Sequence, residues 1–178
     1  MTIASPFPKR ALHFGPLTIA DVGSPTAQNV HLPTIIARLS EKRRFGHHPD
    51  ALTILAHCRL TKALAILDEA PWRVVQWAWR HDWHEAILGD IPAPVKLAVA
   101  SRALDKIERA WDEAICEAEH VQPPDEWIRR EVGRYDGMAC RLEMEALDMT
   151  PDPALPGIPP TIDATEAWGY ATLAGVEA

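Results

Sequence analysis

The sequence predicts an all-α fold, a single bundle of about five or six helices. Two observations predict this class. Apolar residues recur at intervals of three and four, the spacing of amphipathic helices, in successive segments between Pro33 and Leu147. Prolines and glycines lie between these segments, where helices must end. A chain of 178 residues that is 47% hydrophobic and 24% charged suits one globular domain with its own core.

Residues 1–30 are predicted to form an irregular arm, because proline and glycine interrupt this segment too often for a long helix or a strand. The interrupting residues are Pro6, Pro8, Gly15, Pro16, Gly23 and Pro25. The domain itself is expected to span 31–149. A proline-rich C-terminal tail, 150–178, is expected to pack on that domain and to contain one short helix near 165–173.

Two apolar stripes predict the first two helices of the domain. One helix runs from Pro33 to a cationic C-terminal turn at 42–44, where positive charge favours a helix end. The other follows Asp50 and continues to Leu67. His57 lies at the edge of the second stripe, so its side chain is expected to face a neighbouring helix.

A third helix is predicted to begin at Pro71 and to run to about Leu88, because proline suits the first turn of a helix and a glycine follows the last apolar residue. This helix would carry His81, Asp82 and Glu85. A structured loop with two prolines comes next, since proline cannot continue a helix.

Helical periodicity then resumes in two segments, 101–119 and 125–147, which adjacent prolines separate. Asp136 lies within the second of these helices. After 147 the proline-rich tail begins.

The formal net charge of −7 disfavours nonspecific binding to DNA or RNA, because that affinity comes from basic side chains that displace counterions. Small anionic ligands stay compatible with a local cluster of cations. Two such clusters are present, although each is more commonly a solvated helix end. They consist of Lys42, Arg43 and Arg44, and of Arg129, Arg130 and Arg134.

Three cysteines, Cys58, Cys116 and Cys140, are scattered without Cys-x-x-Cys spacing, so neither a disulfide framework nor a thiolate zinc site is indicated. We expect a reducing compartment. The proline-broken N-terminus has no signal-like apolar region, and no apolar run approaches the length that spans a membrane. The chain is therefore expected to be cytoplasmic and to bind no membrane.

The strongest candidate for chemistry is the adjacent pair His81 and Asp82. Glycine-rich nucleotide loops, phosphate loops and nucleophile elbows are absent from the sequence. His57 and Asp136 lie in other predicted helices and can converge on the pair in a bundle. Imidazole and carboxylate ligands suit one divalent Mn, Co, Fe or Zn ion that activates water, and Glu85 could then orient or deprotonate that water. The remaining nearby histidines, His47, His48 and His84, are expected to be solvated.

The order of His57, His81-Asp82 and Asp136 resembles the H…HD…D signature of HD-domain phosphohydrolases. From 81 to 96 the pattern His-Asp-x-x-Glu-x-x-x-Gly-Asp-x-Pro-x-Pro-Val-Lys is similar to that of the bacterial HD 5′-deoxynucleotidases. The segment 36–47 also resembles phage and proteobacterial HD proteins. The resemblance covers roughly 31–147.

The resemblance implies an HD-type helical bundle in which the two histidines and two aspartates bind one metal ion. It further implies that Glu85 and Asp90 assist hydrolysis and that Arg44, Phe45 and Lys96 contact the substrate. The sequence departs from the nucleotidases at Phe45, where they have tryptophan, at Cys58, where they have serine, and at the bulky Trp83.

Two activities on a deoxynucleotide fit the resemblance. One is 5′-nucleotidase action on a monophosphate, and the other is removal of triphosphate from a triphosphate such as dATP, which would bring Mg²⁺ with the nucleotide. A non-catalytic module that binds metal and nucleotide is the alternative. We expect a small-molecule nucleotide as the partner and a homo-oligomer as the assembly.

Overall fold

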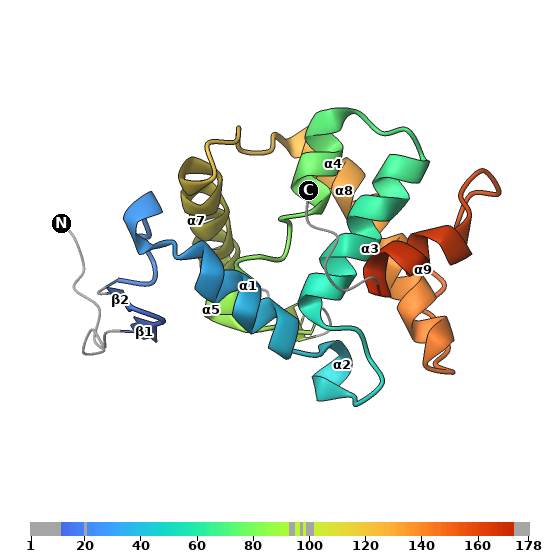
Figure 1. The fold of residues 1–178 in the computed structure, drawn as a ribbon, viewed down its shortest axis with the longest axis horizontal. Helices are drawn as coiled ribbons and strands as arrows, with labels where there is room; N and C mark the ends of the chain where they lie inside the picture. The colour runs from blue at the N-terminus through green and yellow to red at the C-terminus, as the bar shows by residue number, and fades with distance from the viewer. Residues whose placement is uncertain (1–11, 20, 93–94, 97, 99–101, 173–178) are drawn as a thin grey trace.

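A computed structural model describes residues 12–19, 21–92, 95–96, 98 and 102–172, and these are mainly helical (Figure 1). The all-α prediction is confirmed. Within these residues the helices of seven or more residues are α1 (Leu32–Glu41), α3 (Ile54–Leu67), α4 (Trp72–Ala78), α7 (Arg102–Ala118), α8 (Glu126–Ala146) and α9 (Ala164–Thr172). Two shorter helices of a single turn are α2 (Arg44–His47) and α5 (Glu85–Leu88).

The N-terminal segment contains a short antiparallel hairpin, so the prediction of an irregular arm is wrong for its described part. Strand β1 (Leu12–Phe14) pairs with β2 (Leu17–Ile19), and a 3₁₀ helix, η1 (Ala27–Asn29), follows. Gly15 takes the positive φ of 58° that the turn requires. Phe14 and Ile19 are completely buried, so core packing stabilises strands too short to leave a pattern in the sequence.

Helix α3 lies at the centre of the molecule and packs against α1, α4, α8 and α9 (Figure 1). Its residues enter both apolar clusters of the core, with Leu60 and Leu64 in one and Ile54 and Leu55 in the other. The helix begins later than predicted because Thr53 caps it: the Thr53 hydroxyl accepts a hydrogen bond from the Ala56 amide at 3.2 Å.

The helix predicted from Pro71 to about Leu88 is wrong as a continuous element. Helix α4 ends at Ala78, and turns connect it to α5. In these turns amides donate three residues back, as in the bonds from Trp83 to Arg80 and from Glu85 to Asp82. The Ala78 carbonyl, which a continuing helix would use, accepts a hydrogen bond from the His81 side chain at 2.8 Å.

The C-terminal helices confirm their predicted positions. Helix α8 begins after Asp125, whose carboxylate accepts a hydrogen bond from the Ile128 amide at 2.9 Å. The chain then returns along α8 and ends its described part in α9, which packs on α3. Ala167 and Ala171 of α9 belong to the core. None of the helices that the structure describes combines the length and apolar character needed to cross a bilayer.

Candidate metal centre

Three of the four predicted metal ligands converge between α3, α8 and the turns after α4, and the fourth, Asp82, lies beside them. His57 comes from α3, Asp136 from α8, and His81 and Asp82 from the turns. The His57 and His81 Nε2 atoms are 3.3 Å apart. The nearest carboxylate oxygens are Asp136 Oδ1, 3.0 Å from His57 Nε2, and Asp82 Oδ2, 3.3 Å from His81 Nε2. His57, His81 and Asp136 therefore form a group that could hold a metal ion.

Both imidazoles are oriented by hydrogen bonds on the far side of their rings. His57 Nδ1 donates to Glu143 Oε1 at 2.5 Å, and His81 Nδ1 donates to the Ala78 carbonyl at 2.8 Å. These bonds fix the orientation of each ring and place Nε2 at the shared point, where a bound cation would replace the Nε2 proton. The donor set and its support thus fit a divalent transition metal.

The carboxylates of this centre are held in their charged form. Burial alone would raise the pKa of Asp136, but hydrogen bonds with His57 and His81 hold the pKa well below its usual value. The pKa of Asp82 is lowered in the same way, because attraction to His81 outweighs burial. Charged carboxylates beside imidazole nitrogens are the form that binds a cation.

Arg44 lies behind the ligands, with only 15% of its side chain exposed. Its Nε is 3.1 Å from Glu143 Oε2 and its Nη1 is 3.5 Å from Asp82 Oδ2. Phe45 is half-buried beside it at a φ of 51°, with the guanidinium carbon 5.7 Å from the ring centre. The contacts of Arg44 are thus with the metal-ligand set, and its predicted contact with substrate stays a prediction.

Glu143 is the site residue that the sequence analysis missed. Its side chain is 1% exposed and joins His57 to Arg44. It lies two helical turns after Asp136 on α8, a spacing that brings both residues to one face. That spacing is the only signal in the sequence, and it acquires meaning once the position of His57 is known.

Glu85 is buried close to the ligands and keeps one carboxylate oxygen without a hydrogen-bond partner in the described part of the chain. Burial, followed by repulsion from Asp82 and Asp90, raises the pKa of Glu85 to about 9. Lys96 Nζ is 3.8 Å from Glu85 Oε1 and 3.0 Å from Glu108 Oε1. The structure therefore brings Glu85 and Lys96 to the centre, and Asp90 follows α5 nearby.

His84 is buried, so the expectation of a solvated side chain is wrong, whereas His47 and His48 are exposed as expected. The break after α4 is the reason, because the turns direct His84 toward α7 instead of outward. His84 Nδ1 is 3.0 Å from Asp112 Oδ1, and Asp112 Oδ2 is 2.8 Å from Arg129 Nη1.

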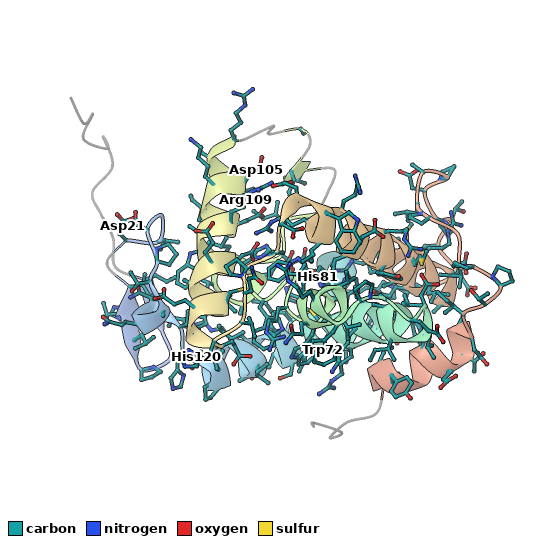
Figure 2. All side chains as sticks on the ribbon, turned by 90° about the horizontal axis from the view of Figure 1, so that it is seen from above. Asp21, Trp72, His81, Asp105, Arg109 and His120 are labelled. Carbon is teal, nitrogen blue, oxygen red and sulfur yellow. The ribbon has the colours of Figure 1, made fainter. Side chains whose placement is uncertain are left out.

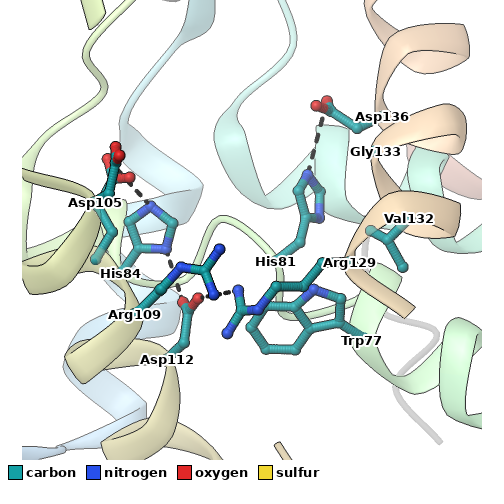
Figure 3. A pocket seen from close by; sticks show the side chains of 11 residues that line it. Trp77, His81, His84, Asp105, Arg109, Asp112, Arg129, Val132, Gly133 and Asp136 are labelled. Carbon is teal, nitrogen blue, oxygen red and sulfur yellow. Dashed lines mark hydrogen bonds and ion pairs between the residues drawn. The ribbon is translucent and has the colours of Figure 1, made fainter. Parts of the chain in front are cut away.

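A cavity of about 280 Å³ opens beside the metal ligands, between the α4–α5 turns, α7 and α8 (Figure 3). Figure 2 shows the labelled His81 deep among the helices, whereas the labelled Trp72 and His120 lie at the periphery. The cavity is lined by Trp77, His81, His84, Asp105, Glu108, Arg109, Asp112, Arg129, Val132, Gly133 and Asp136. Two of the predicted ligands, His81 and Asp136, thus form part of its wall.

Comparison with known proteins adds no family to this geometry. No family model matches the chain, and no curated protein matches it.

Proposed function

We propose that this chain is a metal-dependent phosphohydrolase of the HD type that acts on deoxynucleotides. One observation carries the proposal: the ligand atoms of His57, His81 and Asp136 converge, with Asp82 beside them, and His81 and Asp136 line a cavity large enough for a small molecule. A structural metal site would be closed on all sides, whereas a catalytic site keeps an open position for substrate.

The residues fit distinct parts of phosphoester hydrolysis. A bound Mn, Co, Fe or Zn ion would supply Lewis-acid chemistry and an activated water. The Nδ1 hydrogen bonds of His57 and His81 hold both rings with Nε2 directed toward the position of such an ion. The buried carboxyl of Glu85 is available to exchange a proton with the attacking water or with the departing oxygen. Lys96, whose Nζ is 3.8 Å from Glu85 Oε1, would contact a phosphate oxygen.

The experiment is a nucleotide panel. The chain, loaded with Mn, Co or Zn and shown by metal analysis to hold about one ion, is given mono-, di- and triphosphates of the common ribo- and deoxynucleosides, and products are identified by chromatography. Release of inorganic phosphate from monophosphates supports the nucleotidase activity. Release of inorganic triphosphate from triphosphates supports the triphosphohydrolase activity. Release from no nucleotide, by metal-loaded protein, would reject the proposal. Nucleotide binding without release would favour the non-catalytic module.

Glu85 provides a separate prediction. Glu85→Gln is expected to retain the metal and to lose about a hundredfold in turnover, because glutamine keeps the shape of the side chain but cannot exchange a proton. Turnover and metal content are measured on the same sample. Glu117→Gln, an exposed site on α7, is the matched control. Unchanged turnover in Glu85→Gln would remove Glu85 from the chemistry, and loss of metal would make it a ligand.

A further inference from the structure

The cavity beside the metal ligands has a lining rich in carboxylates. Asp105, Glu108 and Asp112 contribute acidic side chains from α7, and Asp136 contributes a fourth from α8. The cationic side chains in the lining already have acidic partners. Arg129 Nη1 is 2.8 Å from Asp112 Oδ2, and Arg109 Nη1 is 2.6 Å from Glu126 Oε1. Away from the ion, this cavity therefore repels phosphate and accepts hydrogen bonds from hydroxyl or amino groups.

His84 presents at this cavity a buried nitrogen, Nε2, that has an ion-pair contact with Glu108 but no hydrogen bond to any residue that the structure describes. The side chain is about nine-tenths buried. The nearest acidic oxygen, Glu108 Oε1, is 3.9 Å away, too far for a hydrogen bond. The other nitrogen is fixed by Asp112, and Arg129 fixes Asp112 in turn (Figure 3). An oriented ring with one unsatisfied nitrogen is suited to a polar group of a ligand.

We propose that this cavity binds the leaving-group side of the substrate, an uncharged nucleoside, and that His84 is a specificity residue that hydrogen-bonds it. The proposal rests on the proposed function, because it places the scissile phosphate at the metal ligands His81 and Asp136. The nucleoside then extends along the cavity from His81 and Asp136 toward α7. There it meets His84 and the carboxylates of Asp105 and Glu108.

The size of the cavity supports a single nucleoside. Its volume of about 280 Å³ lies just below the usual range of about 300–1,000 Å³ for small-molecule sites, so a molecule larger than one nucleoside would not fit. Trp77 and Val132 provide apolar surface in the same wall, so a ring and a polar edge can both be accommodated. A second phosphate on the nucleoside would face the carboxylates of α7. Among the described lining residues, both arginines already form ion pairs with acidic side chains.

Gly133 allows the cavity to be filled without disturbing the core. It lies on α8 in the cavity wall, and an added Cβ would meet no atom within 4 Å. Gly133→Leu is expected to weaken binding of the product nucleoside by about tenfold or more, because extra methylene groups in a pocket exclude its ligand. Binding of each of the four deoxynucleosides to the metal-loaded chain is measured by calorimetry, together with metal content. Gly169→Leu, an equally open helical glycine on α9, is the control.

The charge of the cavity is tested with a substrate pair that differs at the far end. The deoxynucleoside 3′,5′-bisphosphate carries an extra phosphate where the 5′-monophosphate has a hydroxyl. We expect a kcat/KM for 5′-phosphate release about tenfold or more lower for the bisphosphate, since like charges would face one another. Asp105→Lys should narrow this ratio, whereas Glu113→Lys, an exposed site outside the lining on the same helix, should not.

The outcomes separate the cavity from the reaction. Nucleotide hydrolysis by the parent with unchanged nucleoside binding in Gly133→Leu would overturn the cavity assignment and leave the reaction in place. Equal kcat/KM values for the 3′,5′-bisphosphate and the 5′-monophosphate would show that the cavity does not repel a second phosphate. Nucleoside binding that Gly133→Leu abolishes, in a parent without hydrolysis, would support the cavity and reject the proposed function. His84→Gln, which keeps a hydrogen-bonding group, should retain more nucleoside affinity than His84→Ala, and equal affinities would remove His84 from recognition.

Discussion

At the scale of single residues, Glu143 determines which nitrogen of His57 is available at the centre. Its carboxylate accepts a hydrogen bond from Nδ1–H, so Nε2 is the nitrogen left to bind a cation. The second carboxylate oxygen lies 3.1 Å from Arg44 Nε, which balances the buried negative charge. Burial opposes the charge on Arg44, but Glu143, Asp82 and Asp136 together raise its pKa. Arg44 is thus positive throughout the working range of pH.

Glu143→Gln is predicted to lower metal affinity by about 10- to 100-fold, the usual effect of removing a carboxylate that supports a ligating histidine. Metal affinity is measured by titration against a competing chelator. Glu145→Gln removes the same charge from an exposed position on the same helix and should leave the affinity unchanged. If the two variants bound metal equally well, Glu143 would have only a structural role.

The sequence predicted the candidate ligands but not the residues that orient them. The ligand set followed from an order of residue types along the chain, and Asp82 and His81 can be found without knowing the fold. Glu143 and Glu108 could not, because an acidic residue on a helix is ordinarily a solvated one. The partner of such a residue lies on another helix, and only packing brings the two together.

At the scale of elements, α8 carries a ligand on one side and supports the C-terminal segment on another. Gly137 makes this double contact possible, because a Cβ at this position would lie 2.7 Å from Pro156 Cδ. Arg141 adds hydrogen bonds to the carbonyls of Leu155 and Pro156. The segment after α8 is therefore closely packed against it.

Gly137→Ala is predicted to lower the free energy of unfolding by about 1–3 kcal/mol, since the added methyl group overpacks the contact with Pro156. Denaturant unfolding measures the change. Gly133→Ala is the matched control on the same helix, where the methyl group meets open space. That control should raise stability by up to about 1 kcal/mol, because alanine favours a helix over glycine. Equal effects of the two substitutions would argue against the close contact.

The sequence predicted well those helices whose bounds depend on their own apolar periodicity and on nearby prolines. Helices α7 and α8 follow apolar stripes and end near prolines. The break after Ala78 could not be predicted, because it depends on a hydrogen bond between the His81 side chain and the Ala78 carbonyl. The hairpin could not be predicted either, since Phe14 and Ile19 owe their position to contacts with distant helices.

At the scale of the whole molecule, Asp68 connects the end of α3 to α8. Its carboxylate accepts hydrogen bonds from Arg134 and from the Tyr135 hydroxyl. The hydrogen bond from Arg134 lowers the pKa of Asp68. Burial acts in the opposite direction, and the hydrogen bond from Tyr135 lowers the pKa further. A lowered pKa in the folded state means that ionised Asp68 stabilises the fold above the unfolded pKa of about 4, and that this contribution is lost as the pH falls through the folded pKa.

Asp68→Asn is therefore predicted to destabilise the chain at neutral pH by about 1 kcal/mol or less, because the pair is partly solvated. The difference from the parent should shrink as the pH falls below about 4. Urea unfolding across this range measures it. The exposed Asp148→Asn is the control. A difference that stayed constant into acid would exclude a contribution from the charge of Asp68.

The position of the ligands on three separate parts of the chain has a thermodynamic consequence. His57, His81 and Asp136 are brought together only in the native state. A cation that binds this set, and binds the unfolded chain weakly, stabilises the fold by mass action, by about 4 kcal/mol at a free concentration a thousand times its dissociation constant. The melting temperature then rises with the logarithm of free metal and falls on addition of chelator. Thermal unfolding at buffered metal concentrations thus reads out the occupancy of the centre without any substrate.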